Sequence, residues 1–208
     1  MKAEHVWWLV AVLVSAPALA PAENIDPYET GAQYAWAENV GWLNFEPAQG
    51  PGVQASADRL VGFVWGENIG WVNLSCETTD YCGAVDFGVV NDGLGNLSGF
   101  AWGENVGWIN FAPHVGDDGY GVTIDGDGRF AGWAWGENIG WIRFDAAQAY
   151  NVRACKVGLD DLATMASQWL SLGLWPADLD LSGRVGVTDF ARLAALWMDY
   201  CPDAWPLK

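Results

Sequence analysis

Apolar and polar positions alternate along an eleven-residue phrase that the chain carries four times. The copies read AWAENVGWLNF, VWGENIGWVNL, AWGENVGWINF and AWGENIGWIRF, and they begin at Ala35, Val64, Ala101 and Ala134. They recur at intervals of roughly 30 to 40 residues, the length of a repeat that forms one supersecondary unit and buries its apolar surface against its neighbours. The pattern therefore predicts a repeat domain.

Each copy predicts a β-hairpin. In the second copy, apolar residues alternate on both sides of a Gly-Glu-Asn step, and Asn tolerates the left-handed conformation that a three-residue hairpin loop needs. With residues 66–68 as the loop, Trp65 lies opposite Ile69 and Phe63 lies opposite Trp71. Because successive side chains of a strand point to opposite faces, the three aromatic residues of each hairpin share one face.

The aromatic face is interpreted as the core of the domain. A Trp at the same register in every copy, beside a β-branched residue, is typical of a buried position, and each ring can bury about 150 to 250 Å². The opposite face carries small residues that let another layer approach closely. These small residues are Ala35, Val64, Ala101 and Ala134, with Gly41, Gly70, Gly107 and Gly140.

A further β-rich run precedes each of the last three hairpins, at residues 53–55, 84–90 and 121–124, so the unit is a three-stranded meander. The first copy lacks an obvious leading strand: either it is a cap, or its partner strand comes from elsewhere. The expected fold class is thus an all-β repeat domain of four aromatic hairpin or meander units, closed as a barrel, a ring or a sandwich. A compact antiparallel assembly is favoured because a short open stack leaves two sheet edges to protect.

The turns repeat two polar residues, and their carboxylates suggest glycosidase chemistry, which needs a pair of carboxyl groups across one bond. Recurrence at a single turn position in all copies is better explained by turn formation. The residues are Glu38, Glu67, Glu104 and Glu137, followed by Asn39, Asn68, Asn105 and Asn138. The chain also has no HExxH, GxSxG or phosphate-binding Gly-Lys-Ser/Thr motif, so it is predicted not to be an enzyme.

Residues 1–22 have a charged start, a short apolar run and small residues around Ala20 and Ala22, which is typical of a secretory signal peptide. We expect the mature chain to begin near Glu23 and to be secreted or held at the cell surface. No apolar run reaches the roughly 20 residues that a spanning helix needs, so no integral membrane segment is expected in the mature chain.

The chain carries 26 acidic and 9 basic residues, for a formal net charge of -17. Nucleic acid is excluded as a partner because no cluster of Lys and Arg is present to neutralise phosphates. Four cysteines in an exported chain predict two disulfides. We pair Cys76 with Cys82, in the insertion that lengthens the second repeat, and Cys155 with Cys201.

The pattern changes after the last hairpin, and we place a second domain at residues 150–208, after the β domain of residues 23–149. Apolar residues there follow a helical spacing over residues 160–172 and 188–199. The run DLATMASQWL at residues 161–170 is echoed by DFARLAALWM at residues 189–198. The domain is therefore a duplicated loop-helix unit.

A twelve-residue loop before the second of these helices has the spacing of a calcium loop. Oxygen ligands fall on Asp178, Asp180, Ser182, the carbonyl of Arg184 and Asp189, with glycine at the sharp turn. Calcium is therefore the expected cofactor. The alternative is a solvated acidic turn with Asp189 in the first turn of the helix.

This duplicated loop-helix, with an Asp-closed calcium loop and a Trp late in each helix, resembles the type I dockerin family, as found in exported planctomycete-type bacterial proteins. The resemblance runs from Cys155 to Pro202. It implies a small EF-hand-like module of two helices stapled by calcium, which docks onto a cohesin-type protein. The family's partner-binding positions fall on Val187 and Thr188, and in the first half on Leu159 and Asp160.

The first half departs from the family pattern. Tyr150, Val152 and Ala154 stand at its ligand positions and cannot bind calcium through their side chains. We therefore expect one ion, and we hypothesise that the Cys155–Cys201 bridge clamps this half in place of the missing one.

Three functional hypotheses follow. The favoured one is a non-catalytic exported protein whose β-repeat domain serves surface display or binding and whose C-terminal module docks to a cohesin-type partner. The alternative is a lectin-like protein that binds glycans with its β-repeat domain. An enzyme, with Glu residues from different repeats facing each other, is the third.

Overall fold

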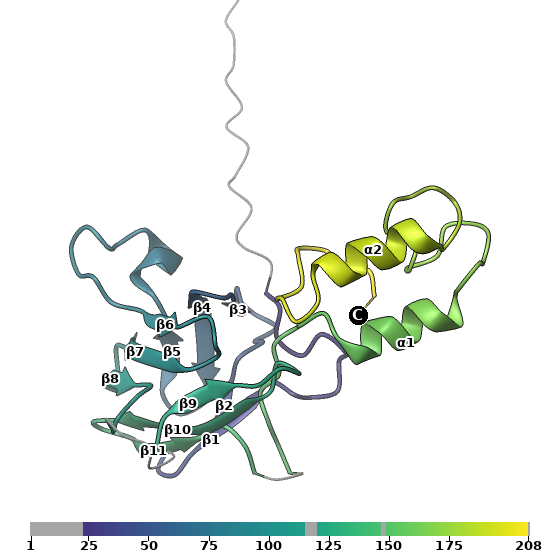
Figure 1. The fold of residues 1–208 in the computed structure, drawn as a ribbon. Helices are drawn as coiled ribbons and strands as arrows, with labels where there is room; N and C mark the ends of the chain where they lie inside the picture. The colour runs from purple at the N-terminus through teal and green to yellow at the C-terminus, as the bar shows by residue number, and fades with distance from the viewer. Residues whose placement is uncertain (1–22, 115–119, 147–148, 208) are drawn as a thin grey trace, which may run out of the picture.

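The computed structural model describes residues 23–114, 120–146 and 149–207, so the predicted signal peptide lies outside the described part of the chain. Figure 1 shows a strand-rich body with two helices on one side of it. In the described residues, no helix has the length and apolar character needed to cross a membrane. The predicted all-β class of the repeat domain is confirmed.

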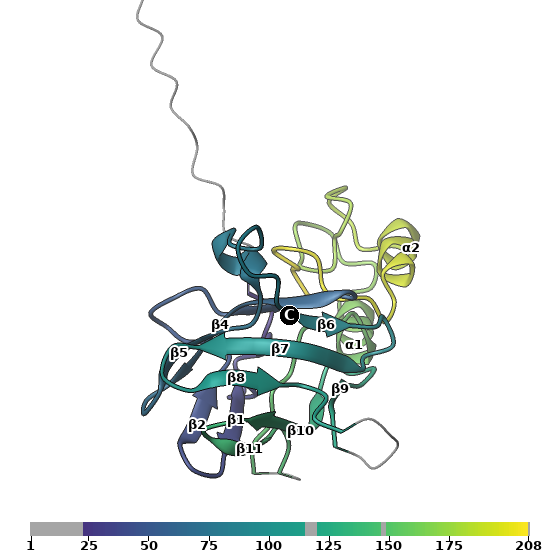
Figure 2. The same cartoon turned by 90° about the vertical axis from the view of Figure 1, so that its left-hand side faces the viewer.

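The four repeats form four antiparallel hairpins. The hairpins are β1 (Tyr34–Ala37) with β2 (Gly41–Asn44), β4 (Arg59–Gly66) with β5 (Gly70–Asn73), β7 (Leu97–Gly103) with β8 (Gly107–Asn110), and β10 (Phe130–Gly136) with β11 (Gly140–Arg143). Each hairpin pairs with the next, as Figure 2 shows for β7, β8 and β10. Because β11 pairs back onto β1, these eight strands close into an antiparallel barrel.

A short leading strand accompanies each of the last three hairpins. These strands are β3 (Val53–Ala55) on β4, β6 (Val89–Asn91) on β7, and β9 (Val122–Ile124) on β10. The predicted three-stranded unit is thus present. The residues between β5 and β6 include a short 3-10 turn, η1 (Cys76–Thr79).

The first hairpin receives its third strand from the far end of the repeat region. Val152 forms a β-bridge with Gln33, and Ala154 forms one with Ile25. Both Val152 and Ala154 are fully buried in the barrel core. Of the two alternatives for the first copy, a partner strand from elsewhere is therefore the one that the structure shows.

The hairpin loop lies one residue later than the sequence predicted. Gly66 pairs with Gly70 and Trp65 pairs with Trp71, so the loop is residues 67–69. The predicted pairings of Trp65 with Ile69 and of Phe63 with Trp71 are therefore wrong, and Phe63 lies opposite Asn73. Gly70 has a φ of +78°, and this left-handed position at the end of the turn fixes the loop where the structure has it.

The aromatic residues of each hairpin share one face, as predicted, but that face points outward, so the interpretation as core is wrong. Five of the hairpin tryptophans, Trp36, Trp42, Trp71, Trp102 and Trp135, are between 37% and 46% exposed. The two cross-strand indoles of each hairpin pack tilted or edge to face, with ring centroids 4.6 to 4.9 Å apart. The aromatic pairs therefore form an outer belt around the barrel.

Aliphatic residues and phenylalanines fill the barrel. Two layers of the interior, each at most 3% exposed, consist of Leu43, Val72, Ile109 and Ile142, and of Phe45, Leu74, Phe111 and Phe144. An eight-stranded barrel is only wide enough for such side chains. Paired indoles from four hairpins do not fit inside it, and this decides which face turns inward.

A ring of asparagine side chains joins the four turns. The amide nitrogen of each turn Asn donates a hydrogen bond to a backbone carbonyl of the preceding hairpin's turn. The pairs are Asn68 with Val40, Asn105 with Ile69, Asn138 with Val106, and Asn39 with Ile139, at 2.9 to 3.1 Å. The repeated Asn therefore has a structural role, but the left-handed conformation predicted for it is wrong, because that conformation lies on Gly41, Gly70, Gly107 and Gly140. The Asn side chains instead link neighbouring turns and close the ring.

The C-terminal region contains α1 (Leu159–Ser167) and α2 (Val187–Ala195) and has its own small core, which includes Met165 and Leu193 at matching positions. Both helices end earlier than predicted. Leu170 and Met198 adopt left-handed conformations, and their amides bond to carbonyls of the loops. The second core begins at Cys155, because residues 151–154 belong to the barrel.

Tyr200 joins the helical region to the barrel. It packs against the barrel core, and its hydroxyl oxygen accepts a 3.0 Å hydrogen bond from the side-chain amide of Asn91. Burial raises the pKa of Tyr200 to about 12, against 10.0 for a free tyrosine. The neutral form is therefore favoured in the folded protein.

We expect this contact to make stability depend on pH in the alkaline range. Because the folded pKa is raised, the stabilisation is complete below pH 10 and is lost as the pH rises towards 12. Tyr200→Phe should remove that loss, so its melting temperature should fall less steeply than that of the parent over this range. Tyr81→Phe, at a side chain that is 57% exposed, is the control and should follow the parent. Equal slopes for all three proteins would contradict the prediction.

Candidate functional site

The loop that precedes α2 brings the predicted calcium ligands together. Carboxylate oxygens of Asp178, Asp180 and Asp189 lie within 4.8 Å of one another. The hydroxyl of Ser182 lies 3.5 Å from Asp178 Oδ1 and donates a 3.2 Å hydrogen bond to the carbonyl of Arg184. The three carboxylates singled out from the sequence therefore converge, with the Ser182 hydroxyl beside Asp178 and the Arg184 carbonyl beside that hydroxyl.

Backbone amides hold these carboxylates in place. The amide of Gly183 donates to Asp178 Oδ2 at 2.8 Å, the amide of Gly186 donates to Asp189 Oδ2 at 2.8 Å, and the amide of Asp180 donates to Asp189 Oδ1 at 3.0 Å. Gly183 has a φ of +83°, which the sharp turn of the loop requires. Asp189 thus caps the helix and closes the loop at the same time.

The charge in this loop suits a cation. Asp178 is 2% exposed and Asp189 is 1% exposed, yet in the described residues no Lys or Arg side chain forms an ion pair with either of them. Carboxylates taken out of water are costly unless they are paired or coordinate a metal. A hydrogen bond from Ser182 lowers the pKa of Asp180, which favours the charged form of that carboxylate. Hard oxygen donors of this kind are the ligands that Ca²⁺ prefers.

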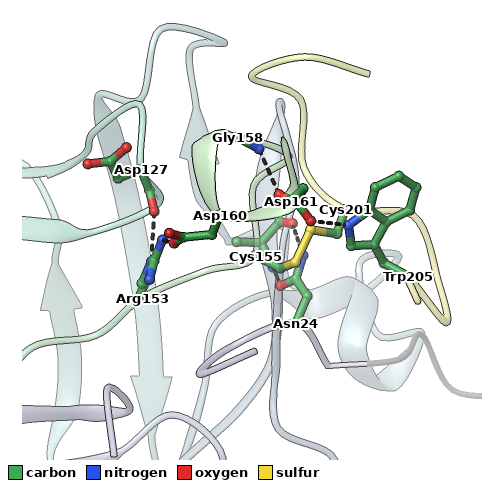
Figure 3. Close-up of a disulfide and its surroundings, with 10 residues drawn as sticks. Asn24, Asp127, Arg153, Cys155, Gly158, Asp160, Asp161, Cys201 and Trp205 are labelled. Atoms are coloured by element: carbon green, nitrogen blue, oxygen red, sulfur yellow. Dashed lines mark hydrogen bonds and ion pairs between the residues drawn. A yellow bond between two sulfur atoms is a disulfide. The ribbon is translucent and has the colours of Figure 1, made fainter. Parts of the chain in front are cut away.

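The corresponding acid in the first half of the module has a different partner (Figure 3). Asp161 accepts a 2.8 Å hydrogen bond from the amide of Gly158, as Asp189 does from Gly186, but its other oxygen accepts a 2.6 Å hydrogen bond from the indole of Trp205. Asp161 is 1% exposed. Among the described residues, no group of acids suited to a metal ion includes Asp161, and the indole satisfies this carboxylate instead.

The disulfides pair the cysteines as the sequence predicted, Cys76 with Cys82 and Cys155 with Cys201. In the first half, the amide of Cys201 donates to the carbonyl of Cys155 at 3.1 Å. At the matching place in the second half, the amide of Gly173 donates to the carbonyl of Gly183 at 2.8 Å. The Cys155–Cys201 disulfide therefore occupies the place that Gly173 and Gly183 have in the second half, beside the acidic loop.

The predicted partner-binding residues lie in the first turns of the two helices. Leu159 is 68% exposed and Val187 is 75% exposed, and Thr188 is exposed beside Val187. Asp160 is exposed but forms a 3.0 Å ion pair with Arg153, a residue of the strand-like segment of the barrel (Figure 3). Other exposed apolar side chains near these turns include Phe190, Trp169 and Trp197.

Two features escaped the sequence interpretation. Trp205 lies 44 residues from its partner Asp161, so no local pattern links them. The sequence interpretation placed the aromatic face in the core, because both faces of each hairpin are apolar and hydropathy alone does not show which face points inward. Among the turn carboxylates, Glu67 and Glu104 line different grooves of this belt, so they are not paired across one site.

Comparisons of the chain with protein-family models, with characterised proteins and with solved structures find no significant match.

Proposed function

We propose that this is a non-catalytic exported protein in which a calcium-bound, dockerin-like module attaches the barrel to a cohesin-type partner. The observation that carries the proposal is the convergence of three carboxylates, of which the two buried ones, Asp178 and Asp189, form no ion pair with a Lys or Arg side chain in the described part of the chain. One cation would neutralise much of this charge and tie the loop to the start of α2. The duplicated loop-helix and the exposed Leu159 and Val187 support the docking role.

Calcium should stabilise the full mature chain, residues 23–208, with a stoichiometry of one ion. At a calcium concentration of 100 times the dissociation constant, the gain is about 2.7 kcal/mol. Asp180→Ala should abolish calcium binding by isothermal titration calorimetry and the calcium-dependent rise in melting temperature. Asp203→Ala, at an exposed acid of the same region, is the matched control and should bind like the parent.

The same proteins, with Val187→Asp added, are then titrated with a type I cohesin domain. The parent should bind it only with calcium present, and Val187→Asp should lose cohesin binding while it keeps calcium binding. A parent that melts identically in calcium and in chelator would refute the metal assignment. A calcium-bound parent that ignores the cohesin would refute the docking assignment.

A further inference from the structure

The outer belt of the barrel has grooves at equivalent places between neighbouring hairpins. One groove lies between the second and third hairpins and is lined by Pro51, Trp71, Asn73, Trp102 and Glu104, among others. We call it the Trp71 groove. The matching Trp42 groove, one repeat earlier, is lined by Tyr34, Trp42, Asn44, Trp65 and Glu67. Each groove thus combines two indoles with an amide and a carboxylate.

In three of the four repeats, an aromatic ring from the segment before the third strand, here called the covering ring, packs against the second tryptophan of a hairpin. Phe87 packs on Trp108 with ring centroids 5.4 Å apart, Tyr120 packs on Trp141 at 5.2 Å, and Tyr150 packs on Trp42 at 5.0 Å. Each of these covering rings comes two residues before a buried Val, as the segments FGV, YGV and YNV at residues 87–89, 120–122 and 150–152 show.

The second repeat breaks this pattern. The matching segment at residues 51–53 reads PGV, so Pro51 stands where the other repeats have an aromatic ring. Gly50 lies against the edge of Trp71, and a Cβ there would come within 2.7 Å of the indole. The Trp71 groove, which has no such ring, has a volume of about 570 Å³, against about 450 Å³ for the Trp42 groove, while Trp71 itself is 37% exposed and Trp42 is 46% exposed.

Polar groups border the Trp71 groove and are available to a ligand. The side-chain oxygen of Asn73 accepts a 3.1 Å hydrogen bond from the amide of Ser75, which orients its NH₂ group and leaves that group without a protein partner in the described residues. The carboxylate of Glu104 likewise has no partner there. Thr79 comes from the loop that the Cys76–Cys82 disulfide closes.

The loop that carries Thr79 is held rigidly over the barrel. Gly62 of β4 donates a 2.9 Å hydrogen bond from its amide to the hydroxyl of Thr78, and the amide of Cys76 bonds to the carbonyl of Phe87 at 3.0 Å. The insertion in the second repeat thus forms a fixed wall of the Trp71 groove. A preformed site of this kind loses little entropy when a ligand binds.

We propose that the Trp71 groove binds pyranose residues of an uncharged glycan. A pyranose has an apolar face of C–H groups that stacks on an indole and a rim of hydroxyls that donate to a carboxylate and accept from an amide. The Glu104 carboxylate and the net charge of -17 disfavour anionic polysaccharides. An extended peptide would find no free strand edge, because β5 is paired on both sides.

The test uses the full mature chain and isothermal titration calorimetry with soluble xylan, mannan and mixed-linkage β-glucan, and with polygalacturonate as the anionic comparison. We expect the parent to bind at least one neutral glycan and not the polygalacturonate. Trp71→Ala should weaken binding on the order of tenfold or more, as removal of a central aromatic contact does. Trp42→Ala, at the matching position of the Trp42 groove, should change it less than twofold.

One further variant and one further pair of variants make the test specific. Pro51→Tyr supplies the covering ring of the other repeats, so it should preserve the melting temperature and abolish glycan binding. Glu104→Gln should weaken binding, and its matched control Glu67→Gln should not. Binding should also persist in chelator, which separates this proposal from the calcium-dependent docking. Failure of all neutral glycans to bind, selective binding of polygalacturonate, or loss of binding in Trp42→Ala but not in Trp71→Ala would overturn the proposal.

Discussion

Gly132→Ala should lower the free energy of unfolding by about 3 kcal/mol or more, the sum of a left-handed backbone penalty and a steric clash. Gly132 has a φ of +89°, and a Cβ at this position would lie 1.9 Å from the carbonyl oxygen of Gly121. That carbonyl belongs to the backbone just before β9 and cannot move without breaking its pairing with β10. Urea unfolding followed by circular dichroism measures the loss.

Gly31→Ala is the matched control for this effect. Gly31 has a φ of +81°, but a Cβ there would meet no atom within 4 Å. Its substitution should therefore cost only the backbone penalty, about 1 kcal/mol. Equal losses for the two variants would show that the close approach of the two backbones does not contribute, and would contradict the prediction.

Removal of the long disulfide, by Cys155→Ala together with Cys201→Ala, should have an effect of similar size. The bridge closes a loop with a sequence separation of 46, and the chain-entropy model gives a loss of about 4 kcal/mol. The double variant Cys76→Ala/Cys82→Ala opens a loop with a separation of only 6 and should lose about 2 kcal/mol. Thermal or urea unfolding at a fixed calcium concentration compares them.

Hydrogen exchange tests whether the bridge clamps the first half of the module. With calcium present, loss of the bridge should reduce the protection of the amides of Val157 and Gly158, which bond to Asp199 and to Asp161. The amides of Gly183 and Gly186 in the acidic loop should keep theirs. Unchanged protection at Val157 and Gly158 would mean that the indole of Trp205 alone holds this half.

The hairpins were predictable because their alternation is strict, but the direction of their faces was not. In the second repeat, Val64 and Val72 occupy one face and Trp65 and Trp71 the other, so neither face is polar. The choice depends on the width of the closed barrel, which follows from the number of strands and not from any one repeat. Residue volume, rather than hydropathy, decides which face is inside.

The boundary of the barrel shows how two interpretations compete for one segment. Tyr150, Val152 and Ala154 were assigned to a degenerate calcium loop because of the repeat in the C-terminal region. In the structure, Val152 and Ala154 are buried in the barrel. Tyr150 and Val152 have the same spacing as Phe87 and Val89, which indicates a leading strand. This match can be recognised only when the barrel is known to close from the last hairpin onto the first.

The acidic loop was the most predictable part of the candidate site, since its five ligand positions lie within twelve consecutive residues. Its local spacing dictates its geometry. The hydrogen bond between Trp205 and Asp161 and the groove around Trp71 depend on residues brought together from distant segments. A single sequence contains no direct record of such contacts.

The strand that completes the first hairpin has a consequence for the order in which the protein can be made. During synthesis, β1 emerges early, but its neighbour β11 belongs to the last repeat and residues 151–154 follow all four repeats. The growing chain therefore cannot lock into its final shape while most of it is still being delivered. Closure of the barrel is therefore deferred until the far end of the repeat region is present.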